Sequence, residues 1–145
     1  MGEAEPTPAA RADMRILVVE DHKDTATVLR RILESTGCAV NQCGTIAEAK
    51  KLAAEQEFDL VFCDIGLPDG SGLDLMRRLG SRQGLPGIAL SGYGMDEDRA
   101  ASRAAGFAEH FIKPVDPERL RIAVARLVGA PPDGDLSARQ TLAPP

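Results

Sequence analysis

The sequence lacks the features that mark membrane-spanning and nucleic-acid-binding chains. Every apolar stretch is interrupted by a charged residue, Gly or Pro, well short of the roughly 20 residues that a membrane-spanning helix needs. No basic block is present either, and 17 Lys and Arg against 22 Asp and Glu give a net charge of −5. We therefore expect neither membrane insertion nor direct binding to nucleic acid.

Cysteine is also scarce, with only Cys38, Cys43 and Cys63 in the chain. An odd number of cysteines does not make a disulfide framework, and no C-x-x-C pair or nearby His suggests zinc. We expect all three to be small buried apolar residues. Because residues 1–13 also contain no apolar signal-peptide region, the expected location is cytoplasmic.

What remains is the composition of one globular domain. The 145 residues are 43% hydrophobic and 27% charged, which is enough apolar material for a buried core. Residues 1–13 and 131–145 are rich in Pro, Ala and charge without periodicity. We expect them to be flexible tails on either side of a domain that covers residues 14–130.

Five short apolar runs alternate with five stretches of helical periodicity in this domain. Several runs are apolar at successive positions, which indicates strands buried on both faces and hence a parallel sheet. Right-handed crossovers then place helices on both faces of that sheet. The expected strands are 15–20, 39–43, 59–64, 87–91 and 110–113, and the expected helices are 25–35, one that a Thr45–Glu48 capping box opens, 72–79, 96–105 and one that begins at Pro117.

Polar residues stand where four of these strands end: Glu20 and Asp21, Asp64, Ser91 and Lys113. Parallel strands end at one edge of the sheet, so these side chains are expected to share one crevice. Clustered carboxylates repel each other, and such a cluster usually persists because a divalent cation neutralises it. An all-oxygen ligand set favours Mg²⁺ over Zn²⁺.

The same residues suit phosphoryl transfer, whose barrier falls mainly through charge neutralisation and positioning. Asp64 would be the nucleophile and phosphoryl acceptor, while Asp21 and Glu20 hold the metal directly or through water. Lys113 would pair with the incoming phosphate and Ser91 would hydrogen-bond one of its oxygens.

Four segments resemble the CheY-like receiver domain of two-component response regulators and hybrid histidine kinases. They are VVED at 18–21, DIGLPDGSG at 64–72, LSGYG at 90–94 and FIKPV at 111–115. The resemblance implies an α/β, flavodoxin-like, doubly wound (βα)5 fold, whose five-stranded parallel sheet has the order 2-1-3-4-5 with helices on both faces.

The resemblance also implies a chemistry. A histidine kinase or histidine phosphotransfer protein would donate the phosphoryl group from a phosphohistidine to Asp64. Mg²⁺ would be held by Asp21, Asp64 and the backbone carbonyl of Gly66, and the Lys113–Pro114 peptide bond would be cis. Phosphorylation would change the surface formed by the fourth helix, the fifth strand and the fifth helix, and a homodimer that forms on phosphorylation is one further expected partner.

Some positions depart from the family pattern or vary within it. His110 stands where receivers usually have a Tyr or Phe ring that turns inward; either the imidazole does the same, with a pH-sensitive switch, or it is a strand histidine without a role. Gly66 and Tyr93, two residues beyond Asp64 and Ser91, are expected to tune the phosphate lifetime. His22 is expected to face solvent, and the polar helix 96–105 to be the moving part.

Other functions remain open. A haloacid-dehalogenase-like phosphatase or phosphotransferase would use Asp64 as nucleophile, but it usually needs an acid at the position of Gly66. A flavin carrier would need a phosphate cradle where the acidic residues stand. A receiver-like scaffold would never be phosphorylated. Within the receiver interpretation, a single-domain regulator and a module of a hybrid histidine kinase are equal alternatives.

Overall fold

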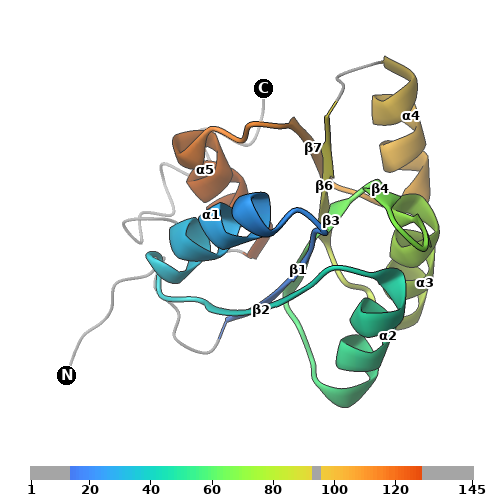
Figure 1. The fold of residues 1–145 in the computed structure, drawn as a ribbon, viewed down its shortest axis with the longest axis horizontal. Helices are drawn as coiled ribbons and strands as arrows, with labels where there is room; N and C mark the ends of the chain where they lie inside the picture. Colours follow the sequence, from blue (N-terminus) through green and yellow to red (C-terminus); the bar gives the residue numbers. More distant parts are fainter. Residues whose placement is uncertain (1–13, 93–95, 129–145) are drawn as a thin grey trace.

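The computed structural model describes residues 14–92 and 96–128; for residues 81–83, 96–98 and 128 it describes only the backbone. Strands and helices alternate along the chain (Figure 1). In order they are β1 (Arg15–Val19), α1 (Lys23–Glu34), β2 (Ala39–Cys43), α2 (Ile46–Glu55), β3 (Leu60–Asp64), β4 (Gly66–Leu67), β5 (Gly70–Ser71), α3 (Gly72–Gln83), β6 (Gly87–Ser91), α4 (Asp96–Ala105), β7 (Glu109–Ile112) and α5 (Pro117–Val128).

The main sheet has five parallel strands in the order β2-β1-β3-β6-β7. Numbered among themselves, these strands have the order 2-1-3-4-5, so the expected flavodoxin-like fold is confirmed. Helices α1 and α5 cover one face of the sheet, and α2, α3 and α4 cover the other (Figure 1). The carboxyl ends of the strands therefore meet at one edge, as a parallel sheet requires.

Alternation along the strands divides the buried side chains between two cores. In β1, Leu17 and Val19 belong to the core under α2 and α3, whereas Ile16 and Val18 belong to the core under α1 and α5. The central strand β3 is buried at every position. This double burial explains why the strand sequences are apolar at successive residues.

The three cysteines are free thiols. Cys38 and Cys63 are buried, as expected, whereas Cys43 is only half-buried because it lies in the edge strand β2. Burial raises the pKa of the Cys43 thiol to about 11 and also raises that of Cys63. Neither thiol is therefore ionised at neutral pH.

The observed elements differ from the expected ones in detail. β1 ends at Val19, one residue before Glu20, and α3 continues to Gln83. The short antiparallel pair β4 and β5 was not expected. The expected tails and Tyr93 lie outside the described residues.

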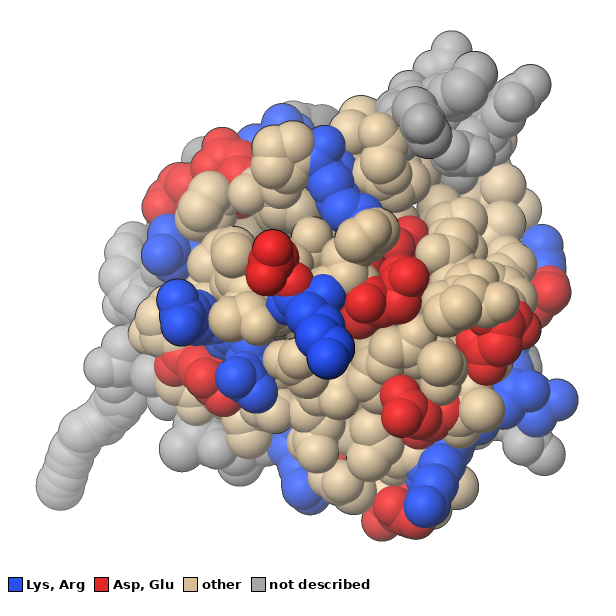
Figure 2. Space-filling model, in the orientation of Figure 1, with Lys and Arg blue, Asp and Glu red and all other residues tan. Residues whose placement is uncertain are grey.

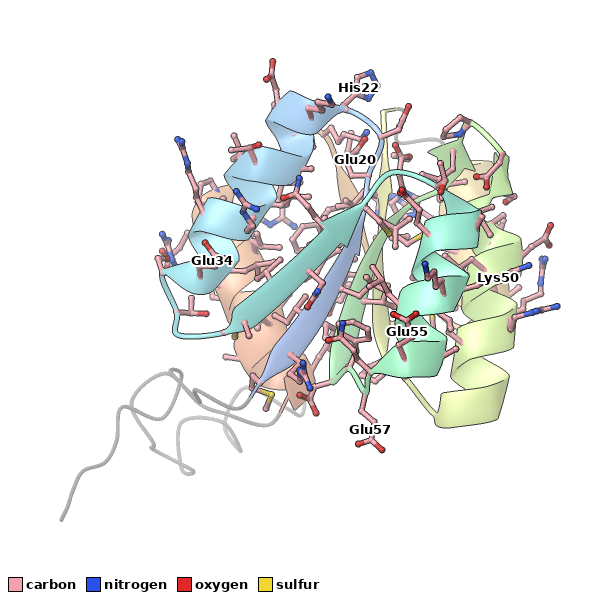
Figure 3. The ribbon with its side chains drawn as sticks, turned by 60° about the horizontal axis from the view of Figure 1, so that its bottom comes forward. Glu20, His22, Glu34, Lys50, Glu55 and Glu57 are labelled. Carbon is pink, nitrogen blue, oxygen red and sulfur yellow. The ribbon has the colours of Figure 1, made fainter. Side chains whose placement is uncertain are left out.

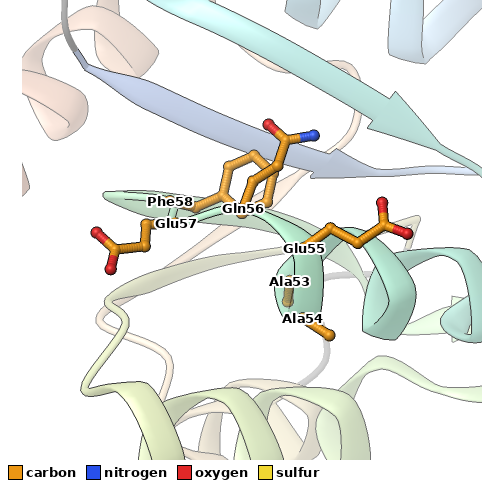
Figure 4. A pocket seen from close by; sticks show the side chains of 6 residues that line it. All are labelled: Ala53, Ala54, Glu55, Gln56, Glu57 and Phe58. Carbon is orange, nitrogen blue, oxygen red and sulfur yellow. The ribbon is translucent and has the colours of Figure 1, made fainter.

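The surface of the described residues carries charges of both signs, as the sequence composition predicts. Basic and acidic side chains are interspersed over the face seen in Figure 2. Within residues 14–92 and 96–128, no helix is long and apolar enough to cross a membrane. A hollow of about 670 Å³ lies where α2 ends and is lined by six consecutive residues, Ala53, Ala54, Glu55, Gln56, Glu57 and Phe58 (Figure 4).

The start of α2 is held by two sets of hydrogen bonds. The Thr45 hydroxyl accepts from the backbone N–H of Glu48, as the expected capping box requires. The Glu48 carboxylate accepts from the backbone N–H of Gly44, one residue before the N-cap, instead of from that of Thr45. Asp69, from the turn between β4 and β5, accepts from the backbone N–H groups of Ile46 and Ala47 at 2.8 and 3.1 Å. The turn after the third strand is thus fastened to α2.

We predict that Asp69→Asn lowers the stability of the fold in a pH-dependent way. Hydrogen bonds from the Ile46 and Ala47 backbone hold the pKa of Asp69 below its ordinary value. The carboxylate therefore stabilises the fold above the unfolded-state pKa of about 3.9, and this contribution disappears as the pH falls through the lower folded-state pKa. Urea denaturation should show a stability loss at pH 7 that shrinks towards pH 3.

The matched control is Asp74→Asn, because Asp74 is an exposed carboxylate that pairs with Arg77 of its own helix. It should cost less at pH 7. Equal losses in the two variants at pH 7, or a loss in Asp69→Asn that stays constant down to pH 3, would contradict the capping role.

Candidate functional site

Four residues with metal-binding side chains meet where β1 and β3 end. One potential ligand atom from each of Glu20, Asp21, His22 and Asp64 lies within 4.8 Å of all the others. Glu20 and Asp64 are buried, whereas Asp21 and His22 are exposed. Figure 3 shows Glu20 and His22 at the opposite end of the sheet from Glu57. The acids that the sequence placed at the strand ends are thus brought together.

Lys113, just after β7, connects the two buried carboxylates of this cluster. Its Nζ donates to Glu20 Oε1 at 2.8 Å and to Asp64 Oδ2 at 2.9 Å. Burial alone would lower the pKa of this ammonium, but the hydrogen bonds to Glu20 and Asp64 outweigh it, so the pKa is raised. Lys113 therefore stays charged at neutral pH. Its peptide bond to Pro114 is cis.

The Glu20 side chain is completely buried and uses both of its oxygens. While Oε1 accepts from Lys113, Oε2 accepts from the backbone N–H of His22 at 3.0 Å and lies 3.3 Å from His22 Nδ1. The His22 ring is 73% exposed, as expected for a residue that faces solvent at the start of a helix. Asp21 is the more accessible of the two neighbouring acids.

The loop that follows Asp64 packs very closely against α3. Asp64 Oδ1 accepts from the backbone N–H of Gly66, and the backbone N–H of Gly72 donates to the Ile65 carbonyl at 2.8 Å. A Cβ on Gly72 would lie 2.2 Å from the Asp64 carbonyl oxygen, whereas a Cβ on Gly66 would meet nothing within 4 Å. Gly72 is thus required by packing, whereas a side chain at Gly66 would extend into open space.

Ser91 ends β6 and is 6% exposed. Its hydroxyl lies 2.8 Å from Nε2 of His110, and Nδ1 of the same ring lies 2.6 Å from the hydroxyl of Ser102 in α4. Ser102 is 1% exposed and was not among the candidate site residues. Its sequence signal is weak, because a serine in a polar helix does not reveal that it faces the sheet.

The sequence of this chain matches the family model of the response regulator receiver domain over residues 16–125. The chain belongs to the receiver-domain family. This confirms the family resemblance of the motifs.

The curated relatives differ in how much of their own length this chain covers. An uncharacterized 14.6 kDa protein from Leptolyngbya boryana is 37% identical over 84% of this chain and 96% of its own length. The KDP operon transcriptional regulatory protein KdpE of Escherichia coli is 34% identical over 77% of this chain, but only 51% of its own length is covered. This receiver domain thus spans about half of that regulator.

Solved receivers have the same fold. The non-phosphorylated HemR receiver domain from Leptospira biflexa has a TM-score of 0.73 at 32% identity, covering 80% of this chain and 94% of its own. The receiver domain of a sensor histidine kinase from Pseudomonas aeruginosa has the same TM-score at 28% identity, covering 80% and 98%. In that structure a magnesium ion is coordinated in the active-site cleft.

We predict that Gly72→Ala destabilises the domain by about 1–3 kcal/mol, because the added methyl group overlaps the Asp64 carbonyl oxygen and the backbone must shift. Gly66→Ala is the matched control in the same loop, where the methyl group meets open space. Urea denaturation should separate the two variants. A Gly72→Ala protein as stable as Gly66→Ala would show that the close approach is not required.

We predict that Lys113→Met destabilises the domain by about 3 kcal/mol, because the buried Glu20 carboxylate loses its cationic partner. The same variant should bind Mg²⁺ more tightly, since removing a positive charge beside the acids strengthens their attraction for a cation. Denaturation and calorimetric Mg²⁺ titration test the two effects.

Lys51→Met, on the exposed side of α2, is the control and should change neither quantity. Unchanged Mg²⁺ affinity in Lys113→Met would mean that the cation binds away from the acids that Lys113 contacts.

Proposed function

We propose that this receiver domain accepts a phosphoryl group on Asp64 from a phosphohistidine of a histidine kinase or histidine phosphotransfer protein. The observation that carries the proposal is the hydrogen bonding of Lys113 to Asp64 and Glu20, with Asp21 in the same cluster. An acceptor carboxylate, a fixed cation and accessible acids are the groups that phosphoryl transfer needs.

Magnesium fits the donor set. Asp21, Asp64 and the Gly66 backbone carbonyl would hold the ion, with Glu20 reaching it through water, and all of these donors are oxygens. When bound, the ion neutralises charge on the phosphoryl oxygens. The relative from Pseudomonas aeruginosa, in whose cleft Mg²⁺ is coordinated, supports this assignment.

The side chains of the site have separate roles in the transfer of the phosphoryl group. Asp64 attacks phosphorus as its carboxylate; the phosphorus–nitrogen bond of the donor breaks, and the departing imidazole keeps the electron pair. Lys113, which already contacts Asp64, neutralises a phosphoryl oxygen, and Ser91 donates a hydrogen bond to another. A side chain at Gly66 would extend into open space, and this position and Tyr93 would tune the phosphate lifetime by admitting or blocking the attacking water.

Phosphorylation then acts as a switch. The phosphoryl group draws Ser91 inward and shifts the surface formed by α4, β7 and α5, because the group binds the two states with different affinity. The changed surface then binds a partner, which can be a second copy of this chain in a homodimer formed on phosphorylation. The receiver would act either as a single-domain regulator or as a module of a hybrid histidine kinase. The cytoplasm is the expected place.

A second function is a small-molecule phosphatase of the haloacid-dehalogenase type. Asp64 would again be the nucleophile, but the residue two positions later is Gly66, which carries no acid to protonate a leaving group. A receiver-like scaffold that is never phosphorylated would not need Asp64, Ser91 and Lys113 together at one edge of the sheet. The phosphorylation switch is therefore the better-supported proposal.

The first test is the intact mass of the full chain after incubation with phosphoramidate and Mg²⁺. We expect one phosphoryl adduct in the wild type and none in Asp64→Asn or after chelation of the metal. The matched control is Asp59→Asn, because Asp59 precedes the same strand at its other end and accepts from the Arg15 backbone. It should keep the adduct.

Each of the other outcomes would indicate a different function or a different acceptor residue. An adduct that persists in Asp64→Asn would place the acceptor elsewhere. Continuous release of phosphate from p-nitrophenyl phosphate would favour the phosphatase. No adduct on a chain that binds Mg²⁺, even with a phosphohistidine donor, would favour the scaffold.

A further inference from the structure

The His110 ring lies between two serines that belong to different elements. In β7, His110 is paired with Ala89 of β6, a core residue on the α2–α4 side of the sheet. Ser91 lies two residues further along β6 and therefore faces the same side. Because Ser102 belongs to α4, the ring connects the end of a central strand to a helix.

A neutral imidazole constrains the two serines to opposite roles. It has one N–H donor and one acceptor nitrogen, so one hydroxyl accepts from the ring while the other donates to it. Ser102 is 1% exposed and Ser91 6%, so both contacts with the ring are shielded from water. The state of one serine is therefore linked to the state of the other.

We propose that Ser102 is a positioning residue through which α4 responds to Ser91, with the His110 ring as the link between them. The inference rests on the proposed function, in which the Ser91 hydroxyl donates to a phosphoryl oxygen. That donation uses the only proton of the hydroxyl, so Ser91 can keep its bond to His110 only as an acceptor. The ring then carries its proton on Nε2, and Ser102 donates to Nδ1.

This arrangement specifies what moves. When Ser91 shifts towards the phosphoryl group, Nε2 follows its acceptor and Nδ1 follows Nε2 because the ring is rigid. Ser102 is drawn along at the opposite nitrogen, and with it the last turn of α4. A phenyl ring at position 110 could fill the same space but could not hold either serine.

Beryllofluoride with Mg²⁺, a mimic of the aspartyl phosphate, tests the proposal on the full chain at pH 8, where histidine is ordinarily neutral. Long-range proton–nitrogen correlation spectra show which ring nitrogen carries the proton. The chain has two histidines, and the signal lost in His110→Phe identifies His110. Backbone amide shifts of residues 99–105 report on α4.

In the wild type, we expect the Nε2–H form in the beryllofluoride complex and a shift of the α4 amides. In Ser102→Ala and in His110→Phe, the α4 shift should be largely lost while the amides around Asp64 still respond. Ser35→Ala is the matched control, because it removes a serine hydroxyl that bonds to the Ile32 carbonyl at the end of α1, a helix on the opposite face of the sheet. It should behave like the wild type.

A proton on Nδ1 in the complex would overturn the proposal, as would an α4 shift in Ser102→Ala as large as in the wild type. The proposed function fails differently. In that case the amides around Asp64 would not respond to beryllofluoride even in the wild type, and the coupling would fall with it.

Discussion

The contact of Lys113 with Glu20 and Asp64 is the interaction on which the rest of the site depends. The three residues follow or end β7, β1 and β3, so one ammonium joins strands that are not all neighbours in the sheet. Two carboxylates buried this closely would repel each other and lose hydration without it. The position of the lysine therefore allows acids to be buried where the strands end.

The site has an excess of negative charge. Three carboxylates meet one ammonium, and the accessible member, Asp21, is on the solvent side. Such a site attracts a cation before it tolerates an anionic phosphoryl group. The order of events in the proposed reaction thus has a simple electrostatic basis: metal first, phosphoryl group second.

Much of the fold and the main site residues could be predicted because their signals are local. Continuous apolar strands predict a parallel sheet, and a parallel sheet brings Glu20, Asp64, Ser91 and Lys113 to one edge whatever the side-chain details. The contacts that were not predicted join residues of different elements, whether 23 positions apart, as Asp69 and Ile46 are, or only 8, as Ser102 and His110 are. Nothing near Asp69 shows that it caps α2, and nothing near Ser102 shows that it faces His110. The close packing of Gly72 against Asp64 likewise exists only in three dimensions.

The elements on the two sides of β3, the strand that ends in Asp64, are held in place by different kinds of contact. On one side the loop after Asp64 is tied to α2 by Asp69 and pressed against α3 at Gly72. On the other side, α4 meets the end of β6 through a ring between two hydroxyls, and hydroxyls reorient easily. A protein that docks only over α2 and the acceptor loop would meet nearly the same surface before and after phosphorylation. It would contact the acceptor itself but would not detect the position of α4.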